Sequence, residues 1–306
     1  MNQNVSDDII IKVEDLTIAY EDKPVLWDIE LGIKKGILMA IVGPNGAGKS
    51  TTIKLLLGLL PIEEGEIFFR GVSLREAPLL LRSYSSSMIE HPFFYPFLTV
   101  SENLDYLDHI FRLGKGREKE VLSLMGLNDH ANKKAQSLSS GLKQRLGLAM
   151  CLFNRPEMLI LDEPLNALDP QGIYELRSIL KMLNQEEGVT IFLSSHILEE
   201  LEKLADHVAI IHGGKVIYQG DISGLIKKQS NIVKFKIDNT SIITQLGYDS
   251  KFSLVEIHDA NHVSFEIRNE NEFAQLIALM SQERIAIYNI TYQESALETA
   301  FIHLTE

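Results

Sequence analysis

The pattern of apolar and polar residues divides the first part of the chain into two kinds of strand. Residues 9–33 and 65–70 alternate between apolar and polar positions, which is typical of antiparallel strands with one buried face. Residues 37–42, 158–161 and 189–193 are instead apolar almost throughout, with Thr190 as the exception. Runs of this kind, with helical patterns between them, predict a parallel sheet covered by helices on both faces. We therefore expect an α/β fold with an antiparallel portion.

Helical patterns follow the first apolar run and fill the middle of the chain. A helix is expected over 50–60, where Pro61 stops it. Residues 99–150 also read as helical, and Thr99 with Glu102 forms a capping box at their start. A hairpin is expected at the glycine pair of 212–215, which separates two apolar runs.

The character of the chain changes near residue 225, so we expect one domain over 1–225 and a small accessory α/β domain over 226–306. In the second domain the expected elements are strands at 232–237, 252–257, 262–267 and 285–291, an intervening helix around Leu276, and a last helix at 294–304. The sequence leaves two readings of this domain open. It is either a regulatory or dimer-stabilising module, or an appendage that only packs.

Composition excludes several classes of protein. The chain has 306 residues and a formal net charge of −13, which argues against a surface built to hold nucleic acid. The single cysteine, Cys151, cannot form an internal disulfide and is typical of a reducing compartment. Residues 1–8 are polar and acidic, unlike a secretory signal. No apolar run approaches the roughly 18 residues of a spanning helix, so we expect a cytoplasmic protein.

Residues 43–50 fit the P-loop pattern G-x-x-x-x-G-K-[ST], and Thr51 follows. The run is Gly43, Pro44, Asn45, Gly46, Ala47, Gly48, Lys49 and Ser50. Glycines let backbone N–H groups wrap closely around a triphosphate, and the start of a helix adds its positive end. Lys49 is then expected to reach the β- and γ-phosphates, and the Ser50 hydroxyl to bind Mg²⁺. The apolar strand before the run and the helix after it favour this reading over a turn that binds nothing.

The apolar run 158–161 ends in two carboxylates, Asp162 and Glu163. In P-loop enzymes a carboxylate at this strand end holds Mg²⁺ through water, which suits Asp162. Glu163 would lie beside the γ-phosphate, where it can polarise the attacking water. Together with the P-loop, this pair predicts a nucleotide hydrolase that uses Mg²⁺.

Further motifs resemble those of one family, the ABC transporter ATP-binding subunits. Residues 138–145, Leu-Ser-Ser-Gly-Leu-Lys-Gln-Arg, look like the ABC signature, whose usual form is L-S-G-G-Q. Residues 166–169, Asn-Ala-Leu-Asp, resemble the D-loop and end in Asp169. His196, after the run 189–193, resembles the switch histidine. Tyr20 sits where the family keeps an aromatic residue that stacks on adenine.

The resemblance implies a P-loop NTPase fold: a RecA-like parallel sheet core with an antiparallel β subdomain and a helical subdomain at about 95–150. It implies a head-to-tail dimer with a second copy of an ATPase subunit, in which ATP lies between the P-loop of one copy and the signature of the other. Ser139, Ser140 and Gly141 would then act on the γ-phosphate across the dimer. His196 would hold the water together with Glu163. A separate integral membrane permease is the expected partner, which puts the chain at the inner face of the cell membrane.

The departures from the family pattern are also informative. Glu90 stands where most of the family has glutamine; a carboxylate there can still bind Mg²⁺ or its waters. In the signature, Ser140 replaces a glycine and Leu142 the glutamine, which leaves Ser139 and Gly141 in place. These features resemble the bacitracin-resistance and lantibiotic-immunity ATPases of Gram-positive bacteria. Export of a peptide antibiotic, a bacteriocin or another drug is therefore the expected task.

Two other functions and one local question stay open. A soluble ABC ATPase acting on ribosomes or DNA usually carries two ATPase cores or a long insertion, and this sequence has neither. A scaffold that binds ATP and hardly hydrolyses it is disfavoured because the candidate catalytic residues are present. The aromatic residues of 93–97 either receive a helix of the membrane partner or pack the base of the helical region.

Overall fold

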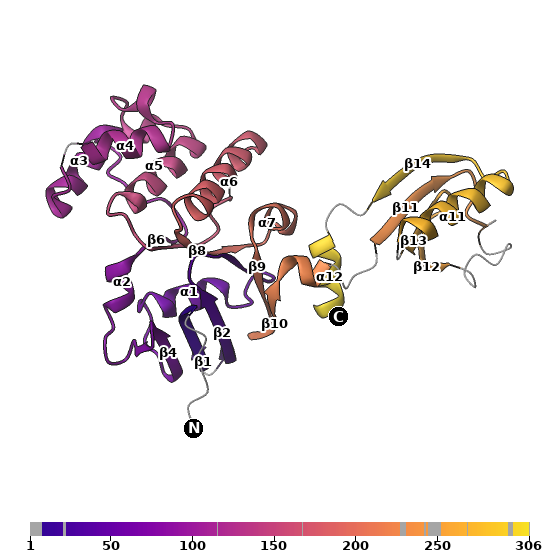
Figure 1. Ribbon diagram of the computed structural model, residues 1–306, viewed down its shortest axis with the longest axis horizontal. Coiled ribbons are helices and arrows are strands. Elements are labelled where there is room, and N and C mark those ends of the chain that lie inside the picture. Colours follow the sequence, from indigo (N-terminus) through magenta and orange to yellow (C-terminus); the bar gives the residue numbers. More distant parts are fainter. Residues whose placement is uncertain are drawn as a thin grey trace. The chain divides into compact units, whose positions relative to one another are not determined.

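The computed structural model (Figure 1) describes residues 8–20, 23–114, 116–166, 168–226, 231–241, 243, 252–267, 269–292 and 296–305. The chain divides into two compact units, Met1–Asp221 and Ile222–Glu306. The boundary expected from the sequence, 225/226, falls inside the helix α8 (Ile222–Ile226). No described helix combines the length and the apolar character needed to cross a bilayer.

A six-stranded sheet in the order β10-β9-β3-β8-β7-β6 forms the centre of the first unit. Its strands are β3 (Leu38–Val42), β6 (Ser85–Met88), β7 (Met158–Leu161), β8 (Thr190–Ser195), β9 (His207–His212) and β10 (Lys215–Asp221). All neighbours are parallel except β9 and β10, which form the expected hairpin. Every residue of β3, β7 and β8 is buried, which explains the apolar character of β3, β7 and the middle of β8. The predicted parallel sheet is confirmed.

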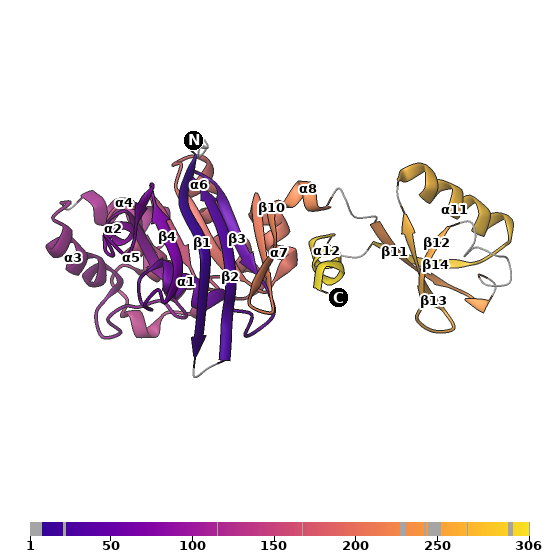
Figure 2. The same ribbon diagram turned by 90° about the horizontal axis from the view of Figure 1, so that it is seen from below.

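The alternating segments form a second sheet, with strands in the order β2-β1-β4-β5, and it is antiparallel throughout. Its strands are β1 (Ile9–Tyr20), β2 (Lys23–Lys34), β4 (Glu64–Phe69) and β5 (Val72–Ser73). Figure 2 shows β1 and β2 side by side. The Gln219 side chain of β10 joins the two sheets, because its amide bonds both the N–H (3.1 Å) and the carbonyl (2.6 Å) of Gly32 in β2.

Seven helices cover or extend the described part of the first unit. They are α1 (Lys49–Leu56), α2 (Leu80–Tyr84), α3 (Val100–Phe111), α4 (Gly116–Leu124), α5 (Ser140–Leu152), α6 (Pro170–Gln185) and α7 (Leu198–Leu204). Two short 3₁₀ turns, Asn128–His130 and Ala135–Ser137, precede α5. The helices α3, α4 and α5 lie together at one end of the unit (Figure 1). The capping box of Thr99 and Glu102 is confirmed at the start of α3.

The predicted end of α1 at residue 60 is wrong, because the helix stops at Leu56. Gly58 adopts a left-handed conformation with φ 60°, and the N–H of Leu59 donates to the carbonyl of Lys54 at 2.8 Å. This is the hydrogen bond of a Schellman motif, which closes a helix without help from a proline. Pro61 lies beyond the C-terminal end of α1, which the conformation of Gly58 sets.

The second unit contains a four-stranded antiparallel sheet in the order β12-β13-β11-β14. Its elements are α8, β11 (Asn231–Ile237), β12 (Ser253–Ile257), β13 (His262–Ile267), α11 (Glu270–Gln282), β14 (Ile287–Tyr292) and α12 (Ala296–Thr305). One face of the sheet packs against Leu276 and Met280 of α11. These strands and the last helix lie within about two residues of the expected ones. The alternating pattern is clearest in β11, where Val233, Phe235 and Ile237 are buried and the lysines between them are exposed.

Candidate active site

The loop of residues 43–48 joins β3 to α1, and its shape requires glycine at two positions. A Cβ on Gly43 would lie 2.3 Å from the carbonyl oxygen of Ile211, and one on Gly48 would lie 2.2 Å from Cδ2 of Leu26. Gly48 also has φ +107°, which L-residues rarely adopt. The loop is therefore packed against β9 and β2, with Asn45 and Gly46 exposed at its tip.

Lys49 is the first residue of α1, and its side chain lies beneath this loop. It is 6% exposed, and its Nζ donates to the carbonyls of Gly43 (2.9 Å) and Pro44 (3.3 Å). The Oε1 of Glu163 is 3.8 Å away. A buried ammonium group held by two carbonyls and one carboxylate can take a phosphate oxygen with little rearrangement.

Asp162 follows β7 and is bound by two hydroxyl groups. It is 3% exposed, and its Oδ1 accepts from Ser50 Oγ at 3.1 Å and from Ser194 Oγ at 2.5 Å. A carboxylate beside a serine hydroxyl supplies the hard oxygen ligands that Mg²⁺ prefers. The residues present therefore fit this metal. Sequence reasoning gave Ser194 no role, although its place at the end of β8, beside β7, was the available signal.

Glu163 lies between Lys49 and His196. Its backbone is left-handed, with φ 50°, and its N–H donates to Ser194 Oγ at 2.8 Å. Its Oε2 is 2.9 Å from Nδ1 of His196, which is exposed at the end of β8. The carboxylate thus faces a buried cation on one side and an accessible imidazole on the other, a geometry suited to orienting a water molecule.

Glu90 follows β6, and its carboxylate pairs with Lys54 of α1 at 2.9 Å. The hydrogen bond and the charge of Lys54 lower the pKa of Glu90 below its ordinary value, so the carboxylate is ionised at neutral pH. Tyr20 is the last residue of β1, and its side chain lies outside the described residues.

The signature and the D-loop meet in a separate cavity of about 550 Å³. Ser139 and Asp169 are the N-caps of α5 and α6, where they accept from the N–H groups of Leu142 (3.4 Å) and Gly172 (3.0 Å). Ser140 and Gly141 also line this cavity, whereas none of its lining residues belongs to the loop of 43–48. The structure thus brings these four residues together, apart from the site around Lys49.

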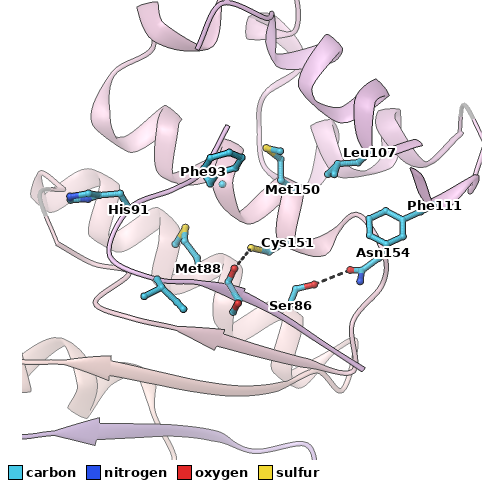
Figure 3. Close-up of a pocket in the computed structure, with 12 residues that line it drawn as sticks. Ser86, Met88, His91, Phe93, Leu107, Phe111, Met150, Cys151 and Asn154 are labelled. Carbon is cyan, nitrogen blue, oxygen red and sulfur yellow. Dashed lines mark hydrogen bonds between the residues drawn. The ribbon is translucent and has the colours of Figure 1, made fainter. Parts of the chain in front are cut away.

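A second hollow, of about 430 Å³, lies between α3, α5 and β6 (Figure 3). Its apolar walls include Phe93, Leu107, Phe111 and Met150, and Cys151 lies in its floor. We call it the groove. Phe93 is 76% exposed and Phe97 is 74% exposed, so these two rings do not pack the base of the helical region.

Comparisons with known proteins identify the family of this chain. The family model described as "ABC transporter" matches residues 26–166. The chain is 37% identical to the bacitracin transport ATP-binding protein BcrA of Bacillus licheniformis, over 96% of this chain and 97% of the relative. It is 39% identical to the lantibiotic transport ATP-binding protein SrtF of Streptococcus pyogenes, over 70% of this chain and 92% of the relative.

Solved structures extend the likeness to three dimensions. The dimeric structure of MJ0796, a bacterial ABC transporter cassette, superposes with a TM-score of 0.62 at 26% identity, covering 69% of this chain and 98% of that one. The predicted resemblance is therefore confirmed. The chain belongs to the ATP-binding subunits of ABC transporters, the ATPases that power a separate membrane permease.

Proposed function

We propose that this subunit drives the export of a peptide antibiotic, a bacteriocin or a related drug, and that its partner permease selects the cargo. The observation that carries the proposal is the similarity to the bacitracin transport protein, which extends over 96% of this chain and so includes the second unit. The lantibiotic transport relative supports the same class of cargo. A soluble ABC ATPase acting on ribosomes or DNA is not favoured by these relatives.

The proposed chemistry follows from the groups around Lys49. Ser50 and Asp162 would hold Mg²⁺, which supplies positive charge to the triphosphate. Lys49 would exchange its carbonyl partners for phosphate oxygens, while the N–H groups of the loop 43–51 surround the phosphates. Glu163 would polarise the attacking water, with His196 holding the water's geometry. Tyr20 would stack on the adenine.

A second copy of an ATPase subunit completes the proposed site. Ser139, Ser140, Gly141 and Asp169 line a cavity apart from the loop of 43–48, so within one chain they do not reach its nucleotide. A head-to-tail dimer brings this surface to the nucleotide of the other copy, where Ser139 offers a hydroxyl and Gly141 a backbone N–H. The related cassette solved as a dimer supports this assembly.

The groove is the proposed docking surface for the permease. The groove is open, its walls include the apolar side chains of Leu107, Phe111 and Met150, and the lining residue Phe93 is highly exposed. An apolar groove of this size suits the apolar face of a short helix. Docking there would hold the subunit on the inner face of the cell membrane and bring the permease close to Glu90, which is chain-adjacent to the groove residues Ile89 and His91.

The test uses the protein expressed with the permease encoded beside it. ATPase activity is measured with and without bacitracin or a cationic peptide. We expect stimulation that requires the permease and is lost in Phe93→Ala. Phe97→Ala is the matched control, since Phe97 is equally exposed and does not line the groove. Activity indifferent to every peptide would contradict the cargo, and equal effects of the two substitutions would contradict the docking surface.

A further inference from the structure

An ion pair links the nucleotide-binding helix to the loop that leads into the groove. The Nζ of Lys54 lies 2.9 Å from Oε1 of Glu90. The side chains are 35% and 62% exposed, respectively, so the pair is at the surface and solvent weakens it. A partner that competes for either charge can therefore separate the two groups.

The position of Lys54 connects the pair to the phosphate site. Lys54 is four residues after Ser50 in α1, and residues with this spacing share one face of a helix. Ser50 in turn bonds the Oδ1 of Asp162 at 3.1 Å. The cation that holds Glu90 therefore stands one helical turn from the hydroxyl that would bind the metal.

The position of Glu90 connects the pair to the groove. Ile89 and His91, its two neighbours in the chain, both line the groove. The N–H of His91 donates to the carbonyl of Ile89 at 2.6 Å, and Glu90 between them has φ 61°. Such a three-residue γ-turn with a positive φ at its centre is strained. The Glu90 side chain, at the centre of this turn, is held by its ion pair with Lys54.

We propose that Lys54 is a positioning residue for Glu90, and that it competes with the metal bound to ATP for the Glu90 carboxylate. Without the metal, Lys54 holds the carboxylate through the ion pair. The metal bound to ATP would draw the carboxylate away from Lys54. This competition rests on the proposed metal site.

Direct metal binding tests the competition. The full chain carries Glu163→Gln to block hydrolysis and is saturated with ATP, and Mn²⁺ binding is followed by electron paramagnetic resonance. We expect Lys54→Gln to tighten Mn²⁺ binding by about two- to fivefold, the range of a surface ion pair. Lys54→Arg should bind Mn²⁺ like the parent, because arginine keeps the charge. Lys203→Gln, which removes the surface ion pair with Glu199, is the control and should change nothing.

A double-mutant cycle separates the pair from a general effect of charge. In a Glu90→Gln background, Lys54→Gln should leave Mn²⁺ binding unchanged. Equal tightening in both backgrounds would mean that Lys54 only repels the metal, and this would overturn the proposal. Weaker Mn²⁺ binding in Lys54→Gln alone would also overturn it, since Lys54 would then present Glu90 rather than withhold it. If the Glu163→Gln chain binds neither ATP nor Mn²⁺, the proposed metal site itself fails.

Discussion

Replacing Glu163 by glutamine removes one negative charge and leaves the shape of the side chain unchanged. In the structure this carboxylate is 2.9 Å from the imidazole of His196 and 3.8 Å from the ammonium of Lys49. Glutamine accepts a hydrogen bond through its oxygen, yet it cannot take a proton from water. The substitution therefore tests the proposed base with little disturbance of the fold.

The size of the effect has two parts. Loss of a general base slows a reaction by roughly 10²- to 10⁴-fold, about 3 to 5 kcal/mol in the barrier. Two unit charges 3.8 Å apart attract by about 4 kcal/mol at an effective dielectric of 20, before desolvation is subtracted. Glutamine removes this competitor for the Lys49 ammonium and a charge that repels the triphosphate. We therefore expect slow turnover with ATP affinity retained or increased.

Single-turnover hydrolysis and an ATP titration measure the two parts separately, and size-exclusion chromatography with ATP reports the dimer. Glu163→Gln should accumulate as an ATP-bound dimer. Glu157→Gln is the matched control: Glu157 lies just before the same strand, at its opposite end, and pairs with Arg70. Its turnover should stay within about twofold of the parent, as expected for a surface charge. Hydrolysis by Glu163→Gln above a tenth of the parental rate would refute the assignment of the base.

Three further outcomes follow from the packing. Gly48→Ala should abolish ATP binding and lower the unfolding free energy by roughly 1–3 kcal/mol, because the added Cβ would lie 2.2 Å from the Leu26 side chain. Gly46→Ala is the control: its Cβ would have no neighbour within 4 Å, so it should cost only the backbone strain. Thermal unfolding compares the two variants. Burial raises the pKa of the Cys151 thiol to about 12. Its reaction with a disulfide reagent should therefore be slow at pH 8 and become about tenfold faster with each pH unit up to that pKa. The unfolded chain should react quickly at pH 8. Leu276→Ala should destabilise the second unit by about 2–5 kcal/mol and leave the basal ATPase rate unchanged; hydrogen exchange localises the effect.

The sequence predicts those features of the fold that follow from a local pattern of residues. The strands β3 and β7 are buried on both faces, so burial alone makes them apolar. The apolar pattern does not predict β6, because this strand begins with three serines and lies at the edge of the sheet. Backbone pairing with β7 makes these residues a strand, and the pattern of side chains does not reveal such pairing. The partners of site residues were missed for a similar reason: nothing in the spacing of Lys54 and Glu90 says that they touch.

The same sheet explains why motifs far apart in the sequence form one site. The loop of 43–48 follows β3, His196 follows β8, Asp162 follows β7 and Glu90 follows β6 soon after its end. These four strands are parallel neighbours in the order β3-β8-β7-β6, so their carboxyl ends share one edge, where α/β sheets bind ligands. Glu90 alone follows the edge strand β6, and its chain neighbours Ile89 and His91 line the groove. Glu90 therefore follows the sheet edge that carries the nucleotide site and is chain-adjacent to the proposed docking surface, so a substitution there is expected to affect metal binding and coupling together.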